Sequence, residues 1–191
     1  MEEEIKQFRD GIFALRTNFG ELAQLMLKKS EGFTSADNNT YDLKGLNGEK
    51  IEVKFSRAYK DIKLTEDNAI SLCCNSSISV YRSDEAEHKD ANYDCNIQQL
   101  KPEFFDVLYY GVFFSDKIEV FRAERAYFPE SIEAFMADKE SARERFPGYA
   151  SQHKNGTECQ FHITKRTHKH HYDNYFLKEI SYEELYDLLR Q

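Results

Sequence analysis

The segment VLYYGVFF, residues 107–114, constrains the fold more than any other part of the sequence, because it is a nearly continuous run of apolar and aromatic residues. A strand with one solvated face alternates between apolar and polar residues, whereas a continuous run is typical of a strand that is buried on both faces. After a tight connection through Ser115, Asp116 and Lys117, the sequence IEVFRA predicts a second strand. The chain is therefore expected to be built around a β-sheet.

Helical patterns accompany these strands. Apolar residues recur at spacings of three and four over residues 5–29, which predicts a helix with Gly20 as the position where it would bend or divide. The stretch from residue 130 to Arg145 also has helical spacing, and Ser181 with Glu184 forms a capping box before a last helix. Since helices and strands alternate without an internal repeat, we expect an α/β or α+β fold with a mixed central sheet flanked by helices. Further extended segments are expected at residues 41–56, 68–82 and 157–163.

The chain length and the residue types exclude several classes of protein. A length of 191 residues allows one domain with a sizeable core, so residues 1–191 are expected to form a single domain. No apolar run is long enough to span a bilayer, and the start MEEEIKQFRD is acidic where a signal peptide would be basic, so a cytoplasmic protein is expected. No glycine loop has the spacing that cradles phosphates, which disfavours a nucleotide cofactor. The four cysteines are expected to be reduced, because they have neither CxxC spacing nor a disulfide pattern: Cys73, Cys74, Cys95 and Cys159.

The stretch YDLKGLNGEKIEVKFS, residues 41–56, carries the chemistry. It predicts a hairpin with a turn rich in Gly and Asn, and Glu52 and Lys54 would share one face of its second strand. Asp42 on the first strand could join Glu52 in binding Mg²⁺, which needs only one or two carboxylates besides water and substrate oxygens. Lys54 could orient or deprotonate a water molecule or stabilise a transition state. This pattern indicates hydrolysis of a phosphodiester.

The same hairpin has a simpler interpretation. A strand with Glu and Lys on its outer face is commonly a solvated edge with an ion pair. An Asp, a Glu and a Lys at these spacings also occur together by chance, so the context of the hairpin decides between the two interpretations.

In that context the chain resembles the PD-(D/E)xK nuclease superfamily, and within it the small type II restriction endonucleases. The resemblance uses the helix FGELAQLMLKK, the motif YDL with IEVKFS, the segment QQLKPEFFDVLYYGVFF and the closing segment YFLKEISYEELYDLL. It places Asp42, Glu52 and Lys54 in the catalytic motif, although Tyr41 stands where the family has its proline. It also implies a metal role for Glu21, which matches a glutamate of the preceding helix in that family.

The resemblance implies a Mg²⁺-dependent enzyme that cuts double-stranded DNA and leaves 5′-phosphate and 3′-hydroxyl ends. A palindromic recognition site would require a homodimer with two active sites. Two alternatives stay open: a structure-selective or repair nuclease with the same site, and a non-catalytic module that binds DNA or a protein partner.

The net charge of −8 does not favour DNA binding, so the distribution of charge matters. Acidic residues crowd the first positions and the segment RSDEAEHKDANYD, whereas HITKRTHKHH, residues 162–171, contains no acid. A contact with DNA phosphates is a better explanation of this segment than a metal cluster of the HNH kind, which lacks its accompanying signature. The expected DNA-contacting residues are Arg57, Lys165, Arg166, His168 and Lys169.

Overall fold

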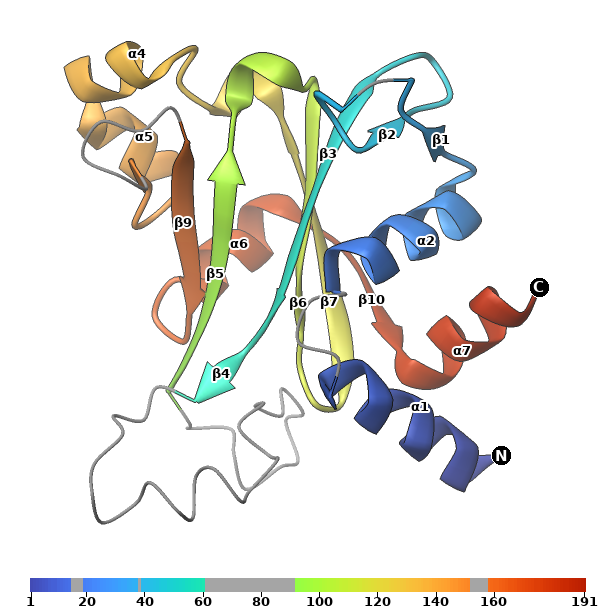
Figure 1. Cartoon of the computed structure of the whole chain (residues 1–191). Coiled ribbons are helices and arrows are strands. Elements are labelled where there is room, and N and C mark those ends of the chain that lie inside the picture. The colour runs from blue at the N-terminus through green and yellow to red at the C-terminus, as the bar shows by residue number, and fades with distance from the viewer. Residues whose placement is uncertain (15–18, 38, 61–91, 152–157) are drawn as a thin grey trace.

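The larger of two sheets forms the centre of the protein. A computed structural model describes residues 1–14, 19–37, 39–60, 92–151 and 158–191. The sheet is mixed, because its second and third strands pair antiparallel, its third and fourth parallel, and its fourth and fifth antiparallel (Figure 1). In spatial order its six strands are β1 (Thr34–Ser35), β2 (Leu43–Lys44), β3 (Lys50–Arg57), β6 (Val107–Phe113), β7 (Lys117–Glu124) and β10 (Phe176–Ser181).

A smaller antiparallel sheet lies beside the larger one. Its first strand follows the last residues of β3, so β3 leads from one sheet into the other. In spatial order its strands are β4 (Tyr59–Lys60), β5 (Tyr93–Leu100), β9 (Cys159–Thr164) and β8 (Ala150–Ser151).

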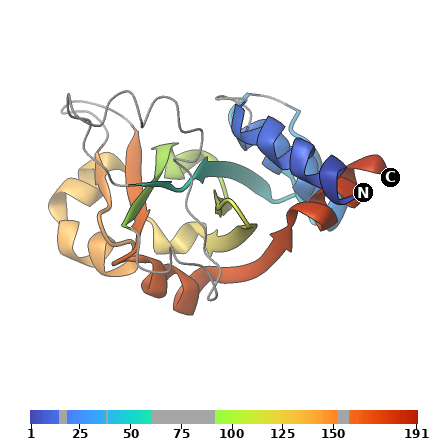
Figure 2. The ribbon, with the colours of Figure 1, turned by 90° about the horizontal axis from the view of Figure 1, so that it is seen from below.

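The helices lie on both faces of the larger sheet. One group packs against one face, and the other helices lie with the smaller sheet on the opposite face (Figures 1 and 2). The first group consists of α1 (Glu2–Ala14), α2 (Phe19–Glu31) and α7 (Tyr182–Arg190). The other helical elements are η1 (Pro102–Phe104), η2 (Arg125–Tyr127), α4 (Ile132–Ala137), α5 (Lys139–Arg145) and α6 (His168–Tyr175).

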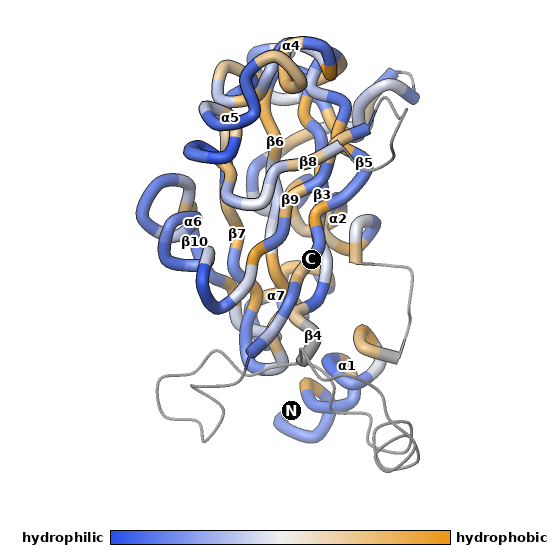
Figure 3. Tube along the Cα trace, turned by 90° about the vertical axis from the view of Figure 1, so that its left-hand side faces the viewer, coloured by the Kyte–Doolittle hydropathy of each residue, from blue (hydrophilic) through white to orange (hydrophobic). Residues whose placement is uncertain are grey.

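The central strand β6 is buried along its whole length, as its apolar sequence predicts. Val107, Tyr109 and Phe113 belong to the core beneath α1, α2 and α7, whereas Leu108 and Tyr110 belong to the core beneath the smaller sheet. Figure 3 shows the hydrophobic residues running along these inner strands. The predicted fold class, a mixed sheet flanked by helices, is therefore confirmed.

Gly111 is required where the two cores meet β6. A Cβ atom at this position would lie 2.1 Å from the ring of Phe55 and 2.4 Å from the backbone oxygen of Glu119. A side chain here would displace the ring of Phe55 and clash with the backbone of β7, so this glycine allows the ring from β3 and the strand β7 to lie close to β6.

Two of the predicted helices are divided. The apolar residues over 5–29 are shared by α1 and α2, so the division that was allowed for is present; Gly20, however, lies inside α2 and not between the two helices, both of which pack against α7. The helical stretch after Pro129 consists of α4 and α5, because the side chain of Asp138 accepts a hydrogen bond from Ser141 N (3.1 Å) and starts a new helix. The capping box of Ser181 and Glu184 is confirmed at the start of α7.

The predicted extended segment at residues 68–82, with Cys73 and Cys74, lies outside the described residues. Cys95 and Cys159 are buried free thiols. None of the helices described here has the length and apolar character needed to cross a bilayer.

Candidate active site

The turn between β2 and β3 sets the register of the predicted hairpin. Gly45 N donates a hydrogen bond to Glu49 O (2.9 Å), and Gly48 has a φ of +87°, which side chains other than glycine rarely adopt. This turn pairs Leu43 with Ile51. The antiparallel pair that the sequence predicts is therefore present.

The alternation along β3 separates its two faces. Ile51, Val53 and Phe55 are buried in the core beneath α2, and Glu52 and Lys54 are partly buried on the opposite face. The core residues thus hold the strand in place while the two charged side chains face a hollow.

Asp42 lies immediately before β2 and is held by hydrogen bonds of both its backbone and its carboxylate. Its backbone N donates to Ile51 O (3.0 Å), and its carboxylate accepts one hydrogen bond from Val53 N (2.8 Å) and one from Gln24 Nε2 (3.0 Å). Because β2 begins only at the next residue, the side chain of Asp42 satisfies a backbone donor of β3. The carboxylate is therefore fixed beside the strand that carries Glu52 and Lys54.

Glu52 and Lys54 form an ion pair with an Oε1–Nζ distance of 2.5 Å. Their side chains are only 13% and 24% exposed, respectively. Burial raises the pKa of Glu52; the charge of Asp42 adds to this effect, and Lys54 opposes it. The ionised form of Glu52 is therefore less favoured than that of a solvated glutamate.

The side chains of Asp42, Glu52 and Lys54 line one hollow, called the first hollow below, with a volume of about 560 Å³. One wall is formed by the segment before β2 and by β3, and the opposite wall by the end of β5, by η1 and by the residue before β9. The lining residues are Asn39, Thr40, Tyr41, Asp42, Glu52, Lys54, Gln99, Lys101, Phe104 and Glu158.

The sequence did not single out three residues of this site. Gln24 fixes Asp42, and Glu158 binds Lys101 with an Nζ–Oε1 distance of 3.1 Å. Phe104 is 42% exposed at the hollow, although its aromatic character and its place just before the buried run of residues 107–114 indicate core. Gln24 could have been considered from the sequence, because it lies one helical turn after Glu21, the predicted site residue of the same helix. Glu158 could not, because it is far from the hairpin in sequence and belongs to no motif.

Glu21 is not brought to this hollow. It is exposed and lines a different hollow, between α1 and α2, with Phe8 and Leu25 among its neighbours. The buried residues of α2 face the sheet and Gln24 faces Asp42, so the turn of the helix directs Glu21 toward α1. Glu21 therefore does not lie where it could share a metal ion with Asp42, contrary to the expectation from the resemblance.

Arg57 was expected to contact DNA, but its side chain is not available for such a contact. It is only 6% exposed, and its Nη1 donates a hydrogen bond to Phe13 O (3.2 Å) at the end of α1. The alternation of β3 already places Arg57 on the buried face with Ile51, Val53 and Phe55, and the packing of α1 supplies its hydrogen-bond acceptor.

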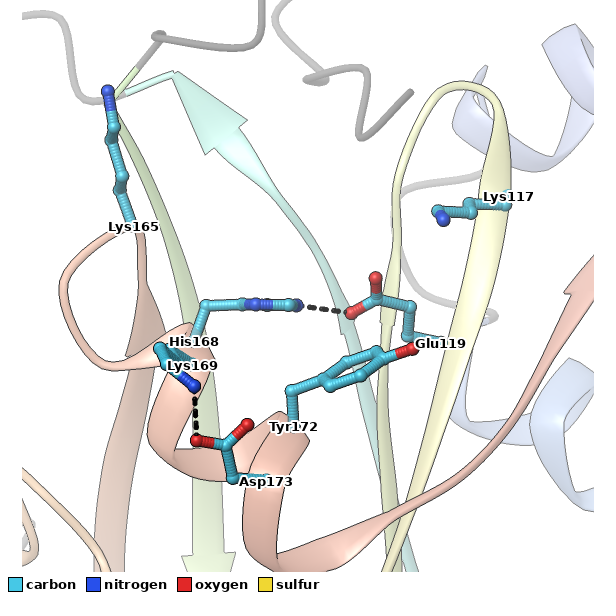
Figure 4. A pocket seen from close by; sticks show the side chains of 7 residues that line it. All are labelled: Lys117, Glu119, Lys165, His168, Lys169, Tyr172 and Asp173. Atoms are coloured by element: carbon cyan, nitrogen blue, oxygen red, sulfur yellow. Dashed lines mark hydrogen bonds and ion pairs between the residues drawn. The ribbon is translucent and has the colours of Figure 1, made fainter. Parts of the chain in front are cut away.

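His168 is also buried, contrary to the expectation of a DNA contact. Its Nε2 lies 2.5 Å from Glu119 Oε2 of β7, and both side chains are at most 5% exposed (Figure 4). The first turn of α6 packs against β7, which turns this histidine inward. Its role is to pair with a carboxylate in the core.

The other basic residues of this segment remain on the surface. Lys165, Arg166 and Lys169 are exposed, and Lys169 pairs with Asp173 at 2.5 Å. Lys165 and Lys169 border a hollow of about 450 Å³ that has Glu119 and His168 among its lining residues (Figure 4). Because Lys165 follows the end of β9 and Glu158 precedes its start, this surface and the first hollow lie at opposite ends of that strand.

The donor set around Asp42 suits a hard divalent cation. Within the described ranges, no group of three or more His, Cys, Asp or Glu side chains is arranged as metal ligands. Two carboxylates nevertheless suffice for Mg²⁺, which keeps several water ligands and binds substrate oxygens. The residues that could hold the ion are Asp42 and Glu52.

Comparisons with other proteins add no family to this description. No protein-family model matches the chain, and no curated protein matches it either.

Proposed function

We propose that this protein is a Mg²⁺-dependent endonuclease that hydrolyses phosphodiester bonds of double-stranded DNA at a specific site. The observation that carries the proposal is the convergence of Asp42, Glu52 and Lys54 in one hollow, with Asp42 anchored to the backbone amide between the other two. Folding brings together the residue types that this hydrolysis needs, in the order in which the restriction endonucleases carry them.

Asp42 and Glu52 would hold the metal ion. The carboxylate of Asp42 keeps acceptor capacity beyond its two hydrogen bonds, because two carboxylate oxygens offer about four lone-pair sites. Glu52 has a raised pKa, for which burial is the main cause, and a neighbouring cation would favour its ionised form. When bound, Mg²⁺ would supply positive charge beside the phosphate and make water more acidic.

Lys54 would act on the attacking water or on the charge that develops on the phosphate. Its ammonium group is paired with Glu52 and its side chain is only 24% exposed, so its position is restricted. A positioned cation in a site of low polarity stabilises developing negative charge more strongly than a solvated lysine does.

The degree of burial favours this interpretation over a solvated ion pair. An ion pair on a strand surface is normally well exposed and contributes about 0–1 kcal/mol to stability. Here Glu52 is 13% exposed, with a pKa that is raised chiefly by burial and also by Asp42. Placing a second carboxylate beside a partly buried one lowers stability, so the arrangement is better explained by binding of a cation.

Cleavage within a palindromic site would use a homodimer, one active site for each strand. We include the homodimer in the proposal because the symmetry of such a DNA site matches that of two copies of the chain. Sedimentation of the protein with and without DNA tests this part separately.

The decisive experiment incubates the purified protein with supercoiled plasmid DNA and Mg²⁺. Discrete linear fragments support a site-specific enzyme, and sequencing their ends reports the site and the expected 5′-phosphates. A smear indicates a nuclease without a defined site, and fragments only from branched or damaged DNA indicate a structure-selective enzyme. Asp42→Asn, purified in parallel, controls for a contaminating nuclease. Absence of cleavage of all these substrates would contradict the proposal and favour a non-catalytic module.

A further inference from the structure

The wall of the first hollow that faces Asp42 and Glu52 is shaped by an irregularity in β5. In the pairing of β5 with β9, Ile97 lies opposite Phe161 and Leu100 lies opposite Cys159. Gln98 and Gln99 of β5 therefore face a single residue of β9, which is the definition of a β-bulge.

This bulge decides which side chains reach the hollow. Before it, the odd-numbered residues Tyr93, Cys95 and Ile97 are buried, and after it Leu100 is buried instead. Because one extra residue reverses the alternation, Gln99 and Lys101 are moved from the core face to the face that lines the hollow.

The backbone of Gln99 adopts a conformation that is unusual for its residue type. Its φ is +58°, and it is the only non-glycine residue with positive φ in the part of the chain described here. Such a conformation is unfavourable without a glycine, and it clusters at sites of function. Glycine would fit this backbone better, so the side chain of Gln99 is retained against a local cost.

Lys101 brings a second ammonium group to the site. Its Nζ lies 3.1 Å from Glu158 Oε1, and its side chain is 44% exposed. Lys101 lines the same hollow as the two carboxylates but comes from the segment after β5, whereas Lys54 stands beside Glu52 on β3.

From this geometry we propose that Gln99 and Lys101 contact the phosphate backbone of the DNA strand being cut, from the wall opposite the catalytic carboxylates. The proposal rests on the nuclease function proposed above and adds two residues to its substrate contacts. Lys54 is paired with Glu52 and acts at the reacting phosphate, whereas Lys101, on another element of the same hollow, is placed to neutralise a phosphate of the DNA backbone. The ion pair with Glu158 is exposed enough to be weak, so phosphate can compete for the ammonium group.

The test for Lys101 compares Lys101→Met with Lys44→Met. Lys44 is also 44% exposed and also has an ion pair, with Asp37 at 3.5 Å, but it does not line the hollow. Binding of duplex DNA is measured in Ca²⁺ over a range of salt concentrations, and single-turnover cleavage in Mg²⁺. Lys101→Met is expected to weaken binding about tenfold and to reduce the magnitude of the salt slope by about 0.9, the value for one phosphate contact. Lys44→Met should change neither by more than about twofold.

The test for Gln99 uses the strain at this residue. Gln99→Gly removes the side chain and relieves the backbone, so its unfolding midpoint should equal or exceed that of the parent protein. DNA binding should nevertheless weaken several-fold with an unchanged salt slope, because an amide carries no charge. Gln98→Ala is the matched control, since Gln98 is an exposed neighbour that does not line the hollow.

The outcomes separate this inference from the proposed function. If the parent protein cuts DNA while Lys101→Met and Gln99→Gly bind and cut as it does, the inference is overturned and the nuclease proposal stands. If the parent protein neither binds nor cuts DNA, both are overturned. Should Lys101→Met fail to fold, Lys101→Gln replaces it with the same expected result.

Discussion

The carboxylate of Asp42 accepts a hydrogen bond from the backbone amide of Val53, at an N–O distance of 2.8 Å. Val53 lies between Glu52 and Lys54 in sequence, and its own side chain is buried in the core. One hydrogen bond therefore ties the first carboxylate to the strand that carries the other two polar groups.

Two substitutions of Asp42 should separate its structural role from its chemical role. Asp42→Ala leaves Val53 N without its acceptor and should lower the free energy of unfolding by about 1–3 kcal/mol. In Asp42→Asn the amide oxygen can still accept from Val53 N, and Gln24 can rotate to accept from the new NH₂ group, so most stability should remain. Both variants should lose cleavage. Denaturant unfolding and plasmid cleavage measure the two effects, and an Asp42→Asn variant that cuts at the parental rate would exclude Asp42 as a metal ligand.

Lys54→Met tests the catalytic role of the lysine. This substitution keeps most of the side-chain stem and removes the charge, so the protein should fold and bind DNA within about tenfold of the parent. The single-turnover rate should fall by a factor of about 10² to 10⁴, which is typical for loss of a group that acts in the transition state. Gel-shift affinity and cleavage are measured on one preparation. A cleavage rate near that of the parent would mean that Lys54 only forms an ion pair with Glu52 and does not act in catalysis.

Glu52→Gln should make the metal-free protein more stable at neutral pH. The pKa of Glu52 is raised in the folded state, chiefly by burial and additionally by Asp42, so folding favours the protonated form. Stability from this group is therefore present below its unfolded pKa of about 4.5 and decreases as the pH rises through the higher folded value. Glutamine cannot ionise, so its stabilising effect should appear at pH 7 and vanish near pH 4.

Thermal unfolding in EDTA at the two pH values checks the sign of this effect. Mg²⁺ should raise the unfolding midpoint of the parent protein and not that of Glu52→Gln, because an ion that binds only the native state stabilises it. A variant that is less stable than the parent at pH 7 would mean that the ion pair with Lys54 outweighs the cost of burial.

The basic surface of Lys165, Arg166 and Lys169 is expected to contact DNA phosphates. Replacing all three by Ala should weaken specific and nonspecific binding alike and reduce the magnitude of the salt slope by about 0.9 for each phosphate that the variant no longer neutralises. Lys6→Ala is a control for Lys169, because Lys6 has a similar pair with Asp10 four residues later. An unchanged slope in the triple variant would place the DNA on another surface.

His168 should matter for stability and not for DNA binding. The hydrogen bond between its Nε2 and Glu119 is buried, so His168→Ala leaves a buried carboxylate without this partner and should cost about 1–3 kcal/mol in the free energy of unfolding. Below the temperature of unfolding, the salt slope of DNA binding should match that of the parent. If His168→Ala showed a reduced salt slope of DNA binding and the stability of the parent, His168 would be a DNA-contacting residue.

Local patterns in the sequence were sufficient to predict those helices and strands whose formation depends on residues close together in the chain. The continuous run at residues 107–114 predicted a strand buried on both faces, and the alternation after the Gly-rich turn placed Glu52 and Lys54 together. The capping box at Ser181 was likewise readable, because its two hydrogen bonds join residues three apart. In each case the period of the side chains alone specifies which residues share a face.

Contacts between distant segments were decided by the tertiary structure. Glu21 and Gln24 lie one turn apart on α2, and the packing of that helix alone selects Gln24 to bind Asp42. The basic segment did not reveal that His168 turns inward to Glu119, because the position of α6 on β7 determines this. The bulge in β5 moved Gln99 and Lys101 into the hollow for a similar reason: the mismatch appears only when β5 is paired with β9. Sequence periodicity defines the faces of an element, but only packing determines what each face meets.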